Sequence, residues 1–203
     1  MKTIYLASSS PRRKELLTAI GLPFSILVGD VDETMEESIS PYDHAKALSE
    51  RKAYAVIDQV PNNSVVIGAD TIVTYMGKLL EKPHSREEAI RMLRALQGKE
   101  HTVYTGLTLL FKDENGQVEE SSCVNSTDVT MHSLTEEEIE AYAATGESMD
   151  KAGAYGIQGK GAVLIESIHG DYYTVMGLPI PQLYLMLRQH GVDLTNYWIK
   201  PGA

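Results

Sequence analysis

Short apolar runs alternate with stretches in which apolar residues recur every three or four positions. The short runs have the length and composition of strands, and the longer spacing is that of one helix face. Strands are predicted at residues 4–7, 24–28, 64–67, 72–75, 78–80, 101–111, 162–168 and 172–175, with a polar strand ending near residue 131. Helices are predicted to begin after Ser10, Ser40, Ser85, Thr135 and Pro179. This mixture is typical of an α/β domain.

The first predicted strand runs into residues 8–14 (SSSPRRK), a turn that opens a helix. Ser10 suits the N-cap and Pro11 the first helical position. Three serines and three cations surround this helix start, which carries about half a positive charge. Cations oppose the helix dipole, and a bound anion such as phosphate would reverse that penalty. The stretch therefore predicts a phosphate site, with an ordinary capped surface helix as the alternative.

Asp70 interrupts the most strongly apolar part of the chain. The runs 64–67 and 72–75 flank it closely, and both are rich in valine and isoleucine. A carboxylate is costly to bury without a partner and is depleted in strands. Such a departure inside a core element is where function is expected. We therefore predict that Asp70 is functional.

The acidic loop after the second predicted strand is a candidate cation site. Asp30, Asp32, Glu33 and Glu36 lie close together in it. Such carboxylates repel one another unless a cation lies among them or water solvates them. Solvation is the more common outcome, although α/β proteins tend to place chemistry in loops that follow strands.

Residues 150–161 (DKAGAYGIQGKG) form the densest glycine region. Such spacing indicates tight turns or a close approach of the backbone to a ligand. It is not the spacing of a Walker loop or of a dinucleotide-binding fingerprint. Gln158 could read the amide edge of a base, or it could cap a turn. Lys82, held extended by the proline that follows it, could reach a phosphate, Asp70 or water.

Composition narrows the class of protein. The 203 residues are 43% hydrophobic and carry a net charge of −10, which argues against a nucleic-acid polymer as partner but permits a local basic pocket. The single cysteine, Cys123, excludes an intrachain disulfide and favours a reducing compartment. No apolar run approaches the ~20 residues of a membrane span, and the N-terminus lacks a signal-peptide core. We expect a cytoplasmic protein with no membrane partner.

Five motifs, in this order, resemble those of the Maf family of nucleoside triphosphate pyrophosphatases. They are residues 7–13 (ASSSPRR), 68–71 (GADT), 81–83 (EKP), 150–159, and 170–173 followed by 177–179. The resemblance implies an α/β fold of the Maf and ITPase-like kind, with a long mixed twisted sheet flanked by helices and a central cleft. It implies one catalytic domain over residues 1–194, a tail at 195–203, and a homodimer.

The resemblance also implies an activity, the hydrolysis of a non-adenine nucleoside triphosphate to its monophosphate and pyrophosphate with Mg²⁺ or Mn²⁺. The family's catalytic proton acceptor falls on Asp70. Its substrate-selecting positions fall on Arg12, Thr71 and Gln158, whose residue types resemble the dTTP/UTP branch rather than the 7-methyl-GTP branch. Other polar family residues fall on Ser8, Arg13, Glu33, Lys52 and Lys82.

These roles suit attack on an α-phosphate, which needs neutralised charge and an aligned water. Glu33, with Asp70, is predicted to hold the metal, with several waters retained. Asp70 is predicted to deprotonate the attacking water, a role that competes with metal binding. The phosphates are predicted to bind the N–H groups of the first helix and the side chains of Ser8, Ser10, Arg13, Lys52 and Lys82.

Two other functions fit parts of the chain. Residues 30–34 (DVDET) match the D-x-D-x-[TV] nucleophile loop of haloacid-dehalogenase-type phosphatases, in which Asp30 would form an aspartyl phosphate. That chemistry needs a downstream acidic pair, and no acidic residue directly follows Asp171. The chain could instead be a nucleotide-binding regulator of septum formation or cell division. The presence of both Asp70 and Glu33 favours catalysis.

Overall fold

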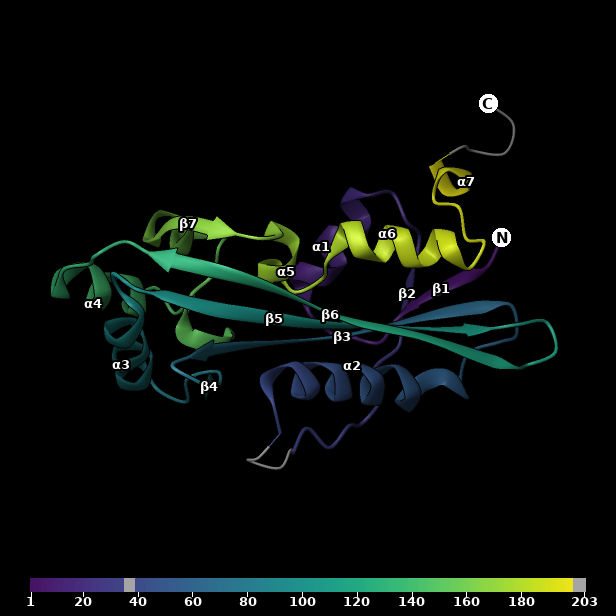
Figure 1. Ribbon diagram of the computed structural model, residues 1–203, viewed down its shortest axis with the longest axis horizontal. Coiled ribbons are helices and arrows are strands. Elements are labelled where there is room, and N and C mark those ends of the chain that lie inside the picture. Colours follow the sequence, from purple (N-terminus) through teal and green to yellow (C-terminus); the bar gives the residue numbers. More distant parts are fainter. Residues whose placement is uncertain (35–38, 199–203) are drawn as a thin grey trace. The chain divides into compact units, whose positions relative to one another are not determined.

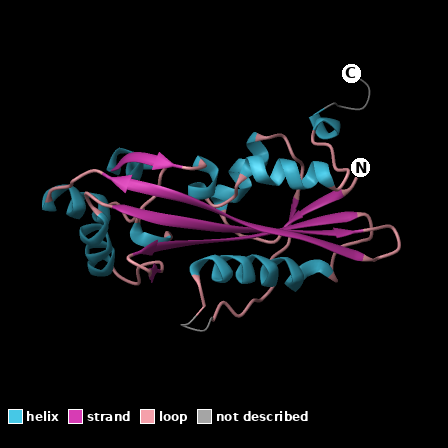
Figure 2. Cartoon of the chain, viewed as in Figure 1, coloured by secondary structure: helices cyan, strands magenta, loops and turns pink. Residues whose placement is uncertain are grey.

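The computed structural model describes residues 1–34 and 39–198 (Figures 1 and 2). Strands and helices alternate in the first part of the chain, two long strands follow, and helices dominate the last part. In chain order the elements are β1 (Thr3–Leu6), α1 (Pro11–Ala19), β2 (Ser25–Ile26), α2 (Pro41–Ile57), β3 (Ser64–Tyr75), β4 (Lys78–Leu80), α3 (Arg86–Leu96), β5 (Glu100–Lys112), β6 (Val118–Met131), α4 (Glu136–Ala144), η1 (Ala152–Ala154), η2 (Gly159–Leu164), β7 (Ile165–His169), α5 (Tyr172–Met176), α6 (Ile180–Gln189) and α7 (Thr195–Trp198).

The strands form one mixed, seven-stranded sheet. Its order is β2-β1-β3-β5-β6-β7, and β4 pairs with β3 beside this path. The strand β1 lies parallel to both β2 and β3, with Tyr5 opposite Ser25 on one side and Val66 on the other. The strands β4 and β7 are antiparallel to their neighbours β3 and β6. The predicted α/β fold, a mixed sheet flanked by helices, is confirmed.

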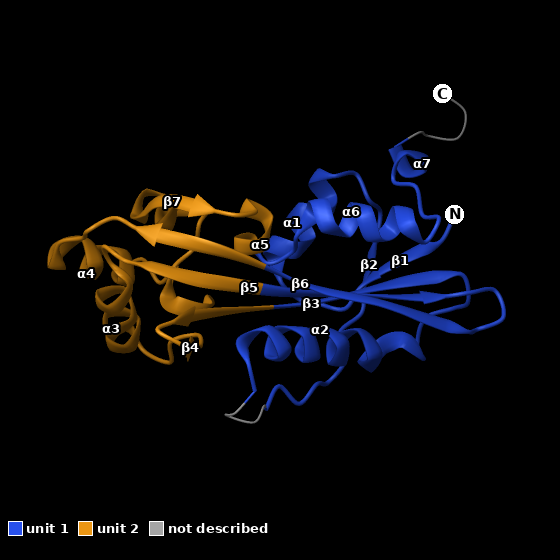
Figure 3. Ribbon diagram, in the orientation of Figure 1, with its two compact units in different colours: residues 1–70, 105–125, 177–203 blue, residues 71–104, 126–176 orange. Residues whose placement is uncertain are grey.

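The chain folds into two compact units (Figure 3). Unit 1 contains Met1–Asp70, Thr105–Asn125 and Gly177–Ala203, and unit 2 contains Thr71–Tyr104 and Ser126–Met176. The long strands β3, β5 and β6 each contribute residues to both units. Neither unit is therefore a continuous piece of sequence. The single catalytic domain over residues 1–194 stays a prediction.

In unit 1, the helix α2 lies directly against β3 and β5 because two glycines leave room for it. A Cβ placed on Gly68 would lie 2.3 Å from the carbonyl oxygen of Ser49, and one on Gly106 would lie 2.1 Å from that of Ala45. Both distances are far inside van der Waals contact, so only glycine fits. The buried cluster here contains Ala7, Ala53, Val56, Ile57, Val60, Val66 and Leu110.

Unit 2 has a core of its own, built from apolar residues of α3, α4 and the strand segments that belong to this unit. Among its buried members are Leu93 of α3 and Ile139 and Tyr142 of α4. The middle of the glycine-rich region also lies in this core, where Ala154 and Tyr155 are buried. The region is therefore anchored near its middle by ordinary hydrophobic packing.

The helix starts predicted from the sequence are confirmed. Ser40 and Ser85 are N-caps whose hydroxyls accept backbone N–H groups, and Thr135 forms the complete capping box with Glu138. Ser10 occupies the N-cap position of α1, but its side chain makes no cap hydrogen bond. The first-turn N–H groups of α1 are thus not capped by that hydroxyl.

The predicted strand at residues 172–175 was wrong, because these residues form the helix α5. The Asp171 carboxylate accepts the backbone N–H of Tyr173 at 3.2 Å and that of Thr174 at 2.9 Å. It also accepts the Thr174 hydroxyl at 2.8 Å. This cap satisfies the first N–H groups of the helix and overrides the strand preference of the aromatic and β-branched side chains.

Two other predicted strands are shorter in the structure than the pattern suggested. The run at residues 24–28 contributes only the two-residue strand β2. In the run at 162–168, the 3-10 helix η2 extends to Leu164, so β7 begins at Ile165. Apolar composition therefore located these segments correctly but overestimated their extended length.

No helix in residues 1–34 and 39–198 is long and apolar enough to cross a membrane.

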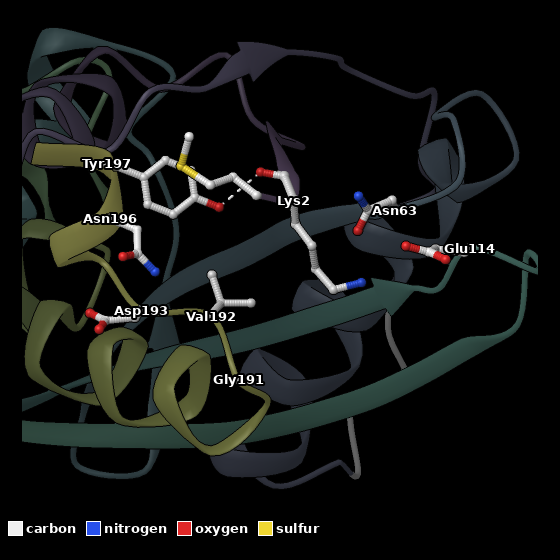
Figure 4. A pocket seen from close by; sticks show the side chains of 9 residues that line it. Lys2, Asn63, Glu114, Gly191, Val192, Asp193, Asn196 and Tyr197 are labelled. Carbon is white, nitrogen blue, oxygen red and sulfur yellow. Dashed lines mark hydrogen bonds between the residues drawn. The ribbon is translucent and has the colours of Figure 1, made fainter. Parts of the chain in front are cut away.

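The tail predicted from residue 195 begins as α7, which belongs to unit 1 and contacts the N-terminal part of that unit. The Tyr197 hydroxyl donates to the carbonyl oxygen of Lys2 at 2.8 Å (Figure 4). The Trp198 indole N–H donates to the carbonyl oxygen of Ile20 at 2.6 Å. A polar cavity of about 280 Å³ beside Lys2 and Tyr197 is lined by none of the predicted site residues. Residues 199–203 of the predicted tail lie outside the described part of the chain.

Candidate functional site

Lys52 joins two carboxylates in unit 1. Its ammonium nitrogen lies 2.5 Å from Oδ1 of Asp70 and 2.8 Å from Oε1 of Glu33. Asp70 belongs to β3, Lys52 to α2, and Glu33 to the loop that precedes α2. The structure thus brings together three residues to which the sequence analysis assigned chemistry, and we call them the Lys52 cluster.

The two carboxylates of the Lys52 cluster differ in burial. Asp70 is 8% exposed, and the Lys52 side chain is 17% exposed, so this pair lies largely out of water. The Glu33 side chain is 60% exposed. An ion pair open to solvent stabilises a fold by only about 0–1 kcal/mol, whereas a buried charge that loses its partner is strongly destabilising. The contact from Lys52 to Glu33 can therefore be exchanged at small cost, and the contact to Asp70 cannot.

Arg13 holds the serine turn in place from the first turn of α1. Its Nε donates to the carbonyl oxygen of Gly177 at 2.7 Å, and its Nη1 donates to Oγ of Ser8 at 3.1 Å. The Ser8 hydroxyl oxygen also accepts the backbone N–H of Ser10 at 3.2 Å. The turn that the sequence analysis predicted to bind phosphate is therefore built around one buried guanidinium.

The charge on Arg13 is balanced by the Lys52 cluster. Burial lowers the pKa of the guanidinium, and the neighbouring charge of Arg12 lowers it further. The carboxylates of Asp70 and Glu33 act in the opposite direction and raise it. The charge of Arg13 thus interacts with the charges of Asp70, Glu33 and Arg12, all within unit 1. An anion bound there would meet cations from two helices.

Arg51 holds the acidic loop against α2, a role that the sequence analysis missed. Its Nη1 donates to the carbonyl oxygens of Asp32 at 3.0 Å and Thr34 at 2.9 Å. The Asp32 carboxylate accepts the backbone N–H of Thr34 at 2.9 Å, and hydrogen bonds from Thr34 lower the pKa of Asp32. The loop residue between them is Glu33, so these bonds present its carboxylate to Lys52. Arg51 lies next to Lys52 on α2, and nothing in the sequence distinguishes it as the residue that contacts the acidic loop. Glu36 lies outside the described residues.

The residues present fit an Mg²⁺ or Mn²⁺ ion. Asp70 and Glu33 offer carboxylate oxygens, the ligands that these hard cations prefer, and both already face one cationic group. In residues 1–34 and 39–198 there is no group of three or more histidine, cysteine, aspartate or glutamate side chains that could hold a metal. Mg²⁺ commonly binds through one or two carboxylates, with substrate phosphates and waters completing its shell. The carboxylates of Asp70 and Glu33 would therefore be enough protein ligands for such an ion.

The other three predicted substrate-binding residues belong to unit 2. Thr71 follows Asp70 in β3 and is half-buried. Lys82 is exposed in the segment between β4 and α3. Gln158 is half-buried and has extended backbone angles directly before η2. That these three residues form one site with the Lys52 cluster stays a prediction.

Comparison with known proteins identifies the family. Residues 3–190 match the family model described as Maf-like protein. A dTTP/UTP pyrophosphatase of Bacillus anthracis and one of Bacillus cereus are each 50% identical to this chain over 198 residues, which is 97% of this chain and 100% of each relative. The Ham1 protein of Staphylococcus aureus aligns with a TM-score of 0.52 at 14% identity, over 93% of this chain and 100% of that one. At that identity the likeness shows a shared fold. Since the family model and these relatives span nearly the whole chain, the chain belongs to the Maf family.

Proposed function

We propose that this chain is a nucleoside triphosphate pyrophosphatase that hydrolyses dTTP and UTP to the monophosphate and pyrophosphate. The observation that carries the proposal is the Lys52 cluster. In a chain of the Maf family, a nearly buried Asp70 pairs with the ammonium of Lys52, beside a serine turn built on a buried arginine. The relatives named dTTP/UTP pyrophosphatases support the choice of substrate, because they match at 50% identity over 97% of the chain.

The unit 1 residues supply the groups that such a hydrolysis needs. The start of α1, with Ser8, Ser10 and Arg13, binds phosphate oxygens by hydrogen bonds and charge. An arriving phosphate can replace Glu33 beside the Lys52 ammonium, which keeps its contact with Asp70. Asp70 then accepts a proton from the attacking water, whose oxygen bonds to the α-phosphorus. The bond from that phosphorus to the bridging oxygen breaks, and pyrophosphate leaves with its electron pair.

A divalent metal completes the proposed site. When bound, Mg²⁺ or Mn²⁺ supplies charge neutralisation for the triphosphate and a lower pKa for a bound water. Glu33 and Asp70 would hold it, and the exchangeable contact from Glu33 to Lys52 frees one ligand for that purpose. Asp70 as base and Asp70 as ligand remain competing roles. The homodimer and the cytoplasmic location stay predictions from the sequence.

Base selection is assigned to Arg12, Thr71 and Gln158. The amide of Gln158 or the hydroxyl of Thr71 would hydrogen-bond the edge of uracil or thymine. A wrong base that leaves such a group unpaired costs about 1–3 kcal/mol. This mechanism predicts that Gln158→Ala changes the ratio of UTP to GTP hydrolysis, and an unchanged ratio would contradict it.

The haloacid-dehalogenase alternative loses support. The family model covers residues 3–190, which include the whole D-x-D-x-[TV] match. Asp171, the downstream candidate, uses its carboxylate to cap α5. A nucleotide-binding regulator of septum formation or cell division remains compatible with the phosphate turn, and it can coexist with catalysis.

The deciding experiment is a product assay across nucleoside triphosphates with Mg²⁺ or Mn²⁺ that separates pyrophosphate from orthophosphate. Pyrophosphate released mainly from dTTP and UTP is the expected result. Release mainly from 7-methyl-GTP would support the proposed reaction but contradict the assignment of the base-selecting residues. Orthophosphate as the product would move the chemistry to Asp30. Bound nucleotide without turnover would favour the regulator.

A further inference from the structure

The loop that carries Gln158, defined as residues 156–161 and including the first three residues of η2, is held by side chains outside it. Three of its six residues are glycines, and a glycine-rich segment loses more conformational freedom on ordering than any other. A side chain that reads a base must be held within about 0.5 Å of its productive position. Something other than the loop's own sequence must therefore fix Gln158. The contacts within unit 2 identify what does.

Glu147 binds the end of this loop through both carboxylate oxygens. The backbone N–H of Lys160 donates to Oε2 at 3.1 Å, and that of Gly161 donates to Oε1 at 3.1 Å. The hydroxyl of Tyr142 donates to the same Oε1 at 3.3 Å. In turn, the Tyr142 hydroxyl oxygen accepts the backbone N–H of Gly156 at 3.2 Å. One carboxylate and one phenol thus hold both ends of the loop, with Gln158 between them.

The loop packs closely against this pair. A Cβ on Gly159 would lie 3.0 Å from both carboxylate oxygens of Glu147, and one on Gly161 would lie 2.8 Å from the Tyr142 hydroxyl. Gly159 also has a φ of +65°, which L-residues rarely adopt. The glycines beside Gln158 are therefore what allows the backbone to reach Glu147 and Tyr142.

The charges agree with this geometry. Burial raises the pKa of Glu147, but the N–H groups of Gly161 and Lys160, the Tyr142 hydroxyl and the Lys151 charge together leave that pKa below its ordinary value. Burial raises the pKa of Tyr142. At neutral pH an ionised acceptor therefore faces two amide donors and a neutral phenol. Charge-assisted hydrogen bonds of this kind are about twice as strong as neutral ones.

We propose that Glu147 is a positioning residue for base selection, which with Tyr142 holds residues 156–161 so that Gln158 can read the nucleobase. The inference rests on the proposed function, in which Gln158 is a selector. It adds that selectivity depends on a carboxylate that need not touch the substrate.

The test is Glu147→Gln, which keeps the size of the side chain but replaces one acceptor oxygen with a donor that faces an amide N–H. We expect the kcat/KM ratio of UTP to GTP to fall about tenfold, which is the discrimination that 1.4 kcal/mol supplies. The fall should come mainly through a higher KM for UTP, with kcat little changed. Tyr142→Phe removes only the hydroxyl and should shift the ratio in the same direction.

Glu140→Gln is the matched control, because Glu140 is an exposed carboxylate on the same helix as Tyr142. It should leave the ratio unchanged. If Glu147→Gln does not fold, as judged by its unfolding curve, Tyr142→Phe carries the test alone. An unchanged ratio in the folded variants, while Gln158→Ala alters it, would overturn the inference and leave the proposed function standing. If the parent protein releases no pyrophosphate from any nucleotide, the proposed function itself fails.

Discussion

Asp70 and Arg13 show how two nearly buried charges are accommodated in unit 1. Each residue is 8% exposed, and each has its partners within hydrogen-bond distance, Lys52 for Asp70 and the Gly177 carbonyl and Ser8 hydroxyl for Arg13. Buried ion pairs are weak contributors to stability, since desolvation offsets their attraction. Their presence in the interior of unit 1 is better explained by the chemistry that we propose for them than by folding.

Asp70→Asn tests the proposed base. Because an amide cannot accept the proton of the attacking water, kcat should fall by about 10²–10⁴-fold, the usual contribution of a general base. The unfolding midpoint should stay close to that of the parent, since the amide oxygen can still accept the Lys52 hydrogen bond. Steady-state pyrophosphate release and urea unfolding measure the two effects.

Asp30→Asn serves as the matched control for that experiment. Asp30 is an exposed carboxylate of unit 1 in the loop that also carries Glu33. Its substitution should leave turnover unchanged. Near-normal activity in Asp70→Asn together with lost activity in Asp30→Asn would contradict the assignment and return the chemistry to an aspartyl phosphate.

His101 is a second residue whose environment predicts a measurable property. It is 3% exposed in unit 2, its Nε2 lies 2.7 Å from the Tyr155 hydroxyl, and burial lowers its pKa to about 4. In the unfolded chain its pKa is about 6.5. Below that pH the unfolded state therefore takes up a proton that the folded state does not, and the free energy of unfolding falls.

The expected loss from this histidine is about 2 kcal/mol between pH 7 and pH 5, and it is complete once the pH falls below about 4. His101→Gln removes the titration while keeping a polar side chain. Urea unfolding of both proteins across this range should show a flatter pH dependence for the variant. Equal losses in the two proteins would show that His101 does not titrate as its burial suggests.

At the scale of elements, the contact between β3 and α2 positions the Lys52 cluster. Lys52 lies on α2 and Asp70 on β3, and the glycine contact at Gly68 lies two positions before Asp70 in that strand. The helix backbone approaches so closely that the Ser49 carbonyl oxygen occupies the space of a Cβ on Gly68. The distance between the two charged groups is therefore set by backbone packing rather than by side-chain choice.

Gly68→Ala should push α2 away from β3. Overpacking of this kind costs about 1–3 kcal/mol, and the displaced Lys52 should lower activity as well. Adding Ala53→Gly should not restore either property, because the 2.3 Å contact is with backbone oxygen of Ser49 rather than with the Ala53 side chain. Urea unfolding and turnover by the folded protein measure both effects.

Gly191→Ala is the control for that variant. Its new Cβ would meet nothing within 4 Å, although its φ of +72° imposes a backbone cost of about 1–2 kcal/mol. It should lose stability but keep full turnover once folded. If Gly68→Ala also keeps full turnover, the close packing of α2 serves the fold and not the site.

At the scale of the whole molecule, the cationic groups of the site act against an acidic background. The net charge is −10, and exposed charges act on a ligand mainly within about a Debye length, ~8 Å at physiological salt. A free triphosphate anion that nears the acidic surface is therefore repelled until it lies close to the cations of the proposed site. A nucleotide that carries a divalent cation has less charge to bring near this protein. We therefore expect that the proposed substrate binds as its metal complex.

Removal of divalent metal should abolish turnover and leave the fold intact. Chelation with EDTA is expected to stop pyrophosphate release, and excess Mg²⁺ or Mn²⁺ should restore it. The circular dichroism spectrum and the unfolding midpoint should not change, because the proposed metal binds with substrate. Turnover that continues after exhaustive chelation would contradict the metal proposal, and a chelator-induced fall in the midpoint would indicate a structural metal instead.

Helix starts, most strands and the family could be predicted from the sequence because each depends on residues close together in the chain. A serine or threonine cap satisfies N–H groups within three positions of itself, and an apolar run shows its own burial preference. Asp70 stood out for the same reason, as a charge inside such a run. The Maf motifs are likewise short and local.

The partners that hold the site together came only from the tertiary structure. Lys52 meets Asp70 across 18 positions and Arg13 meets Gly177 across 164. Glu147 reaches a loop 13 positions away. No propensity or spacing encodes such contacts. They form because a buried polar group must find a partner wherever packing brings one, and packing depends on the whole chain at once.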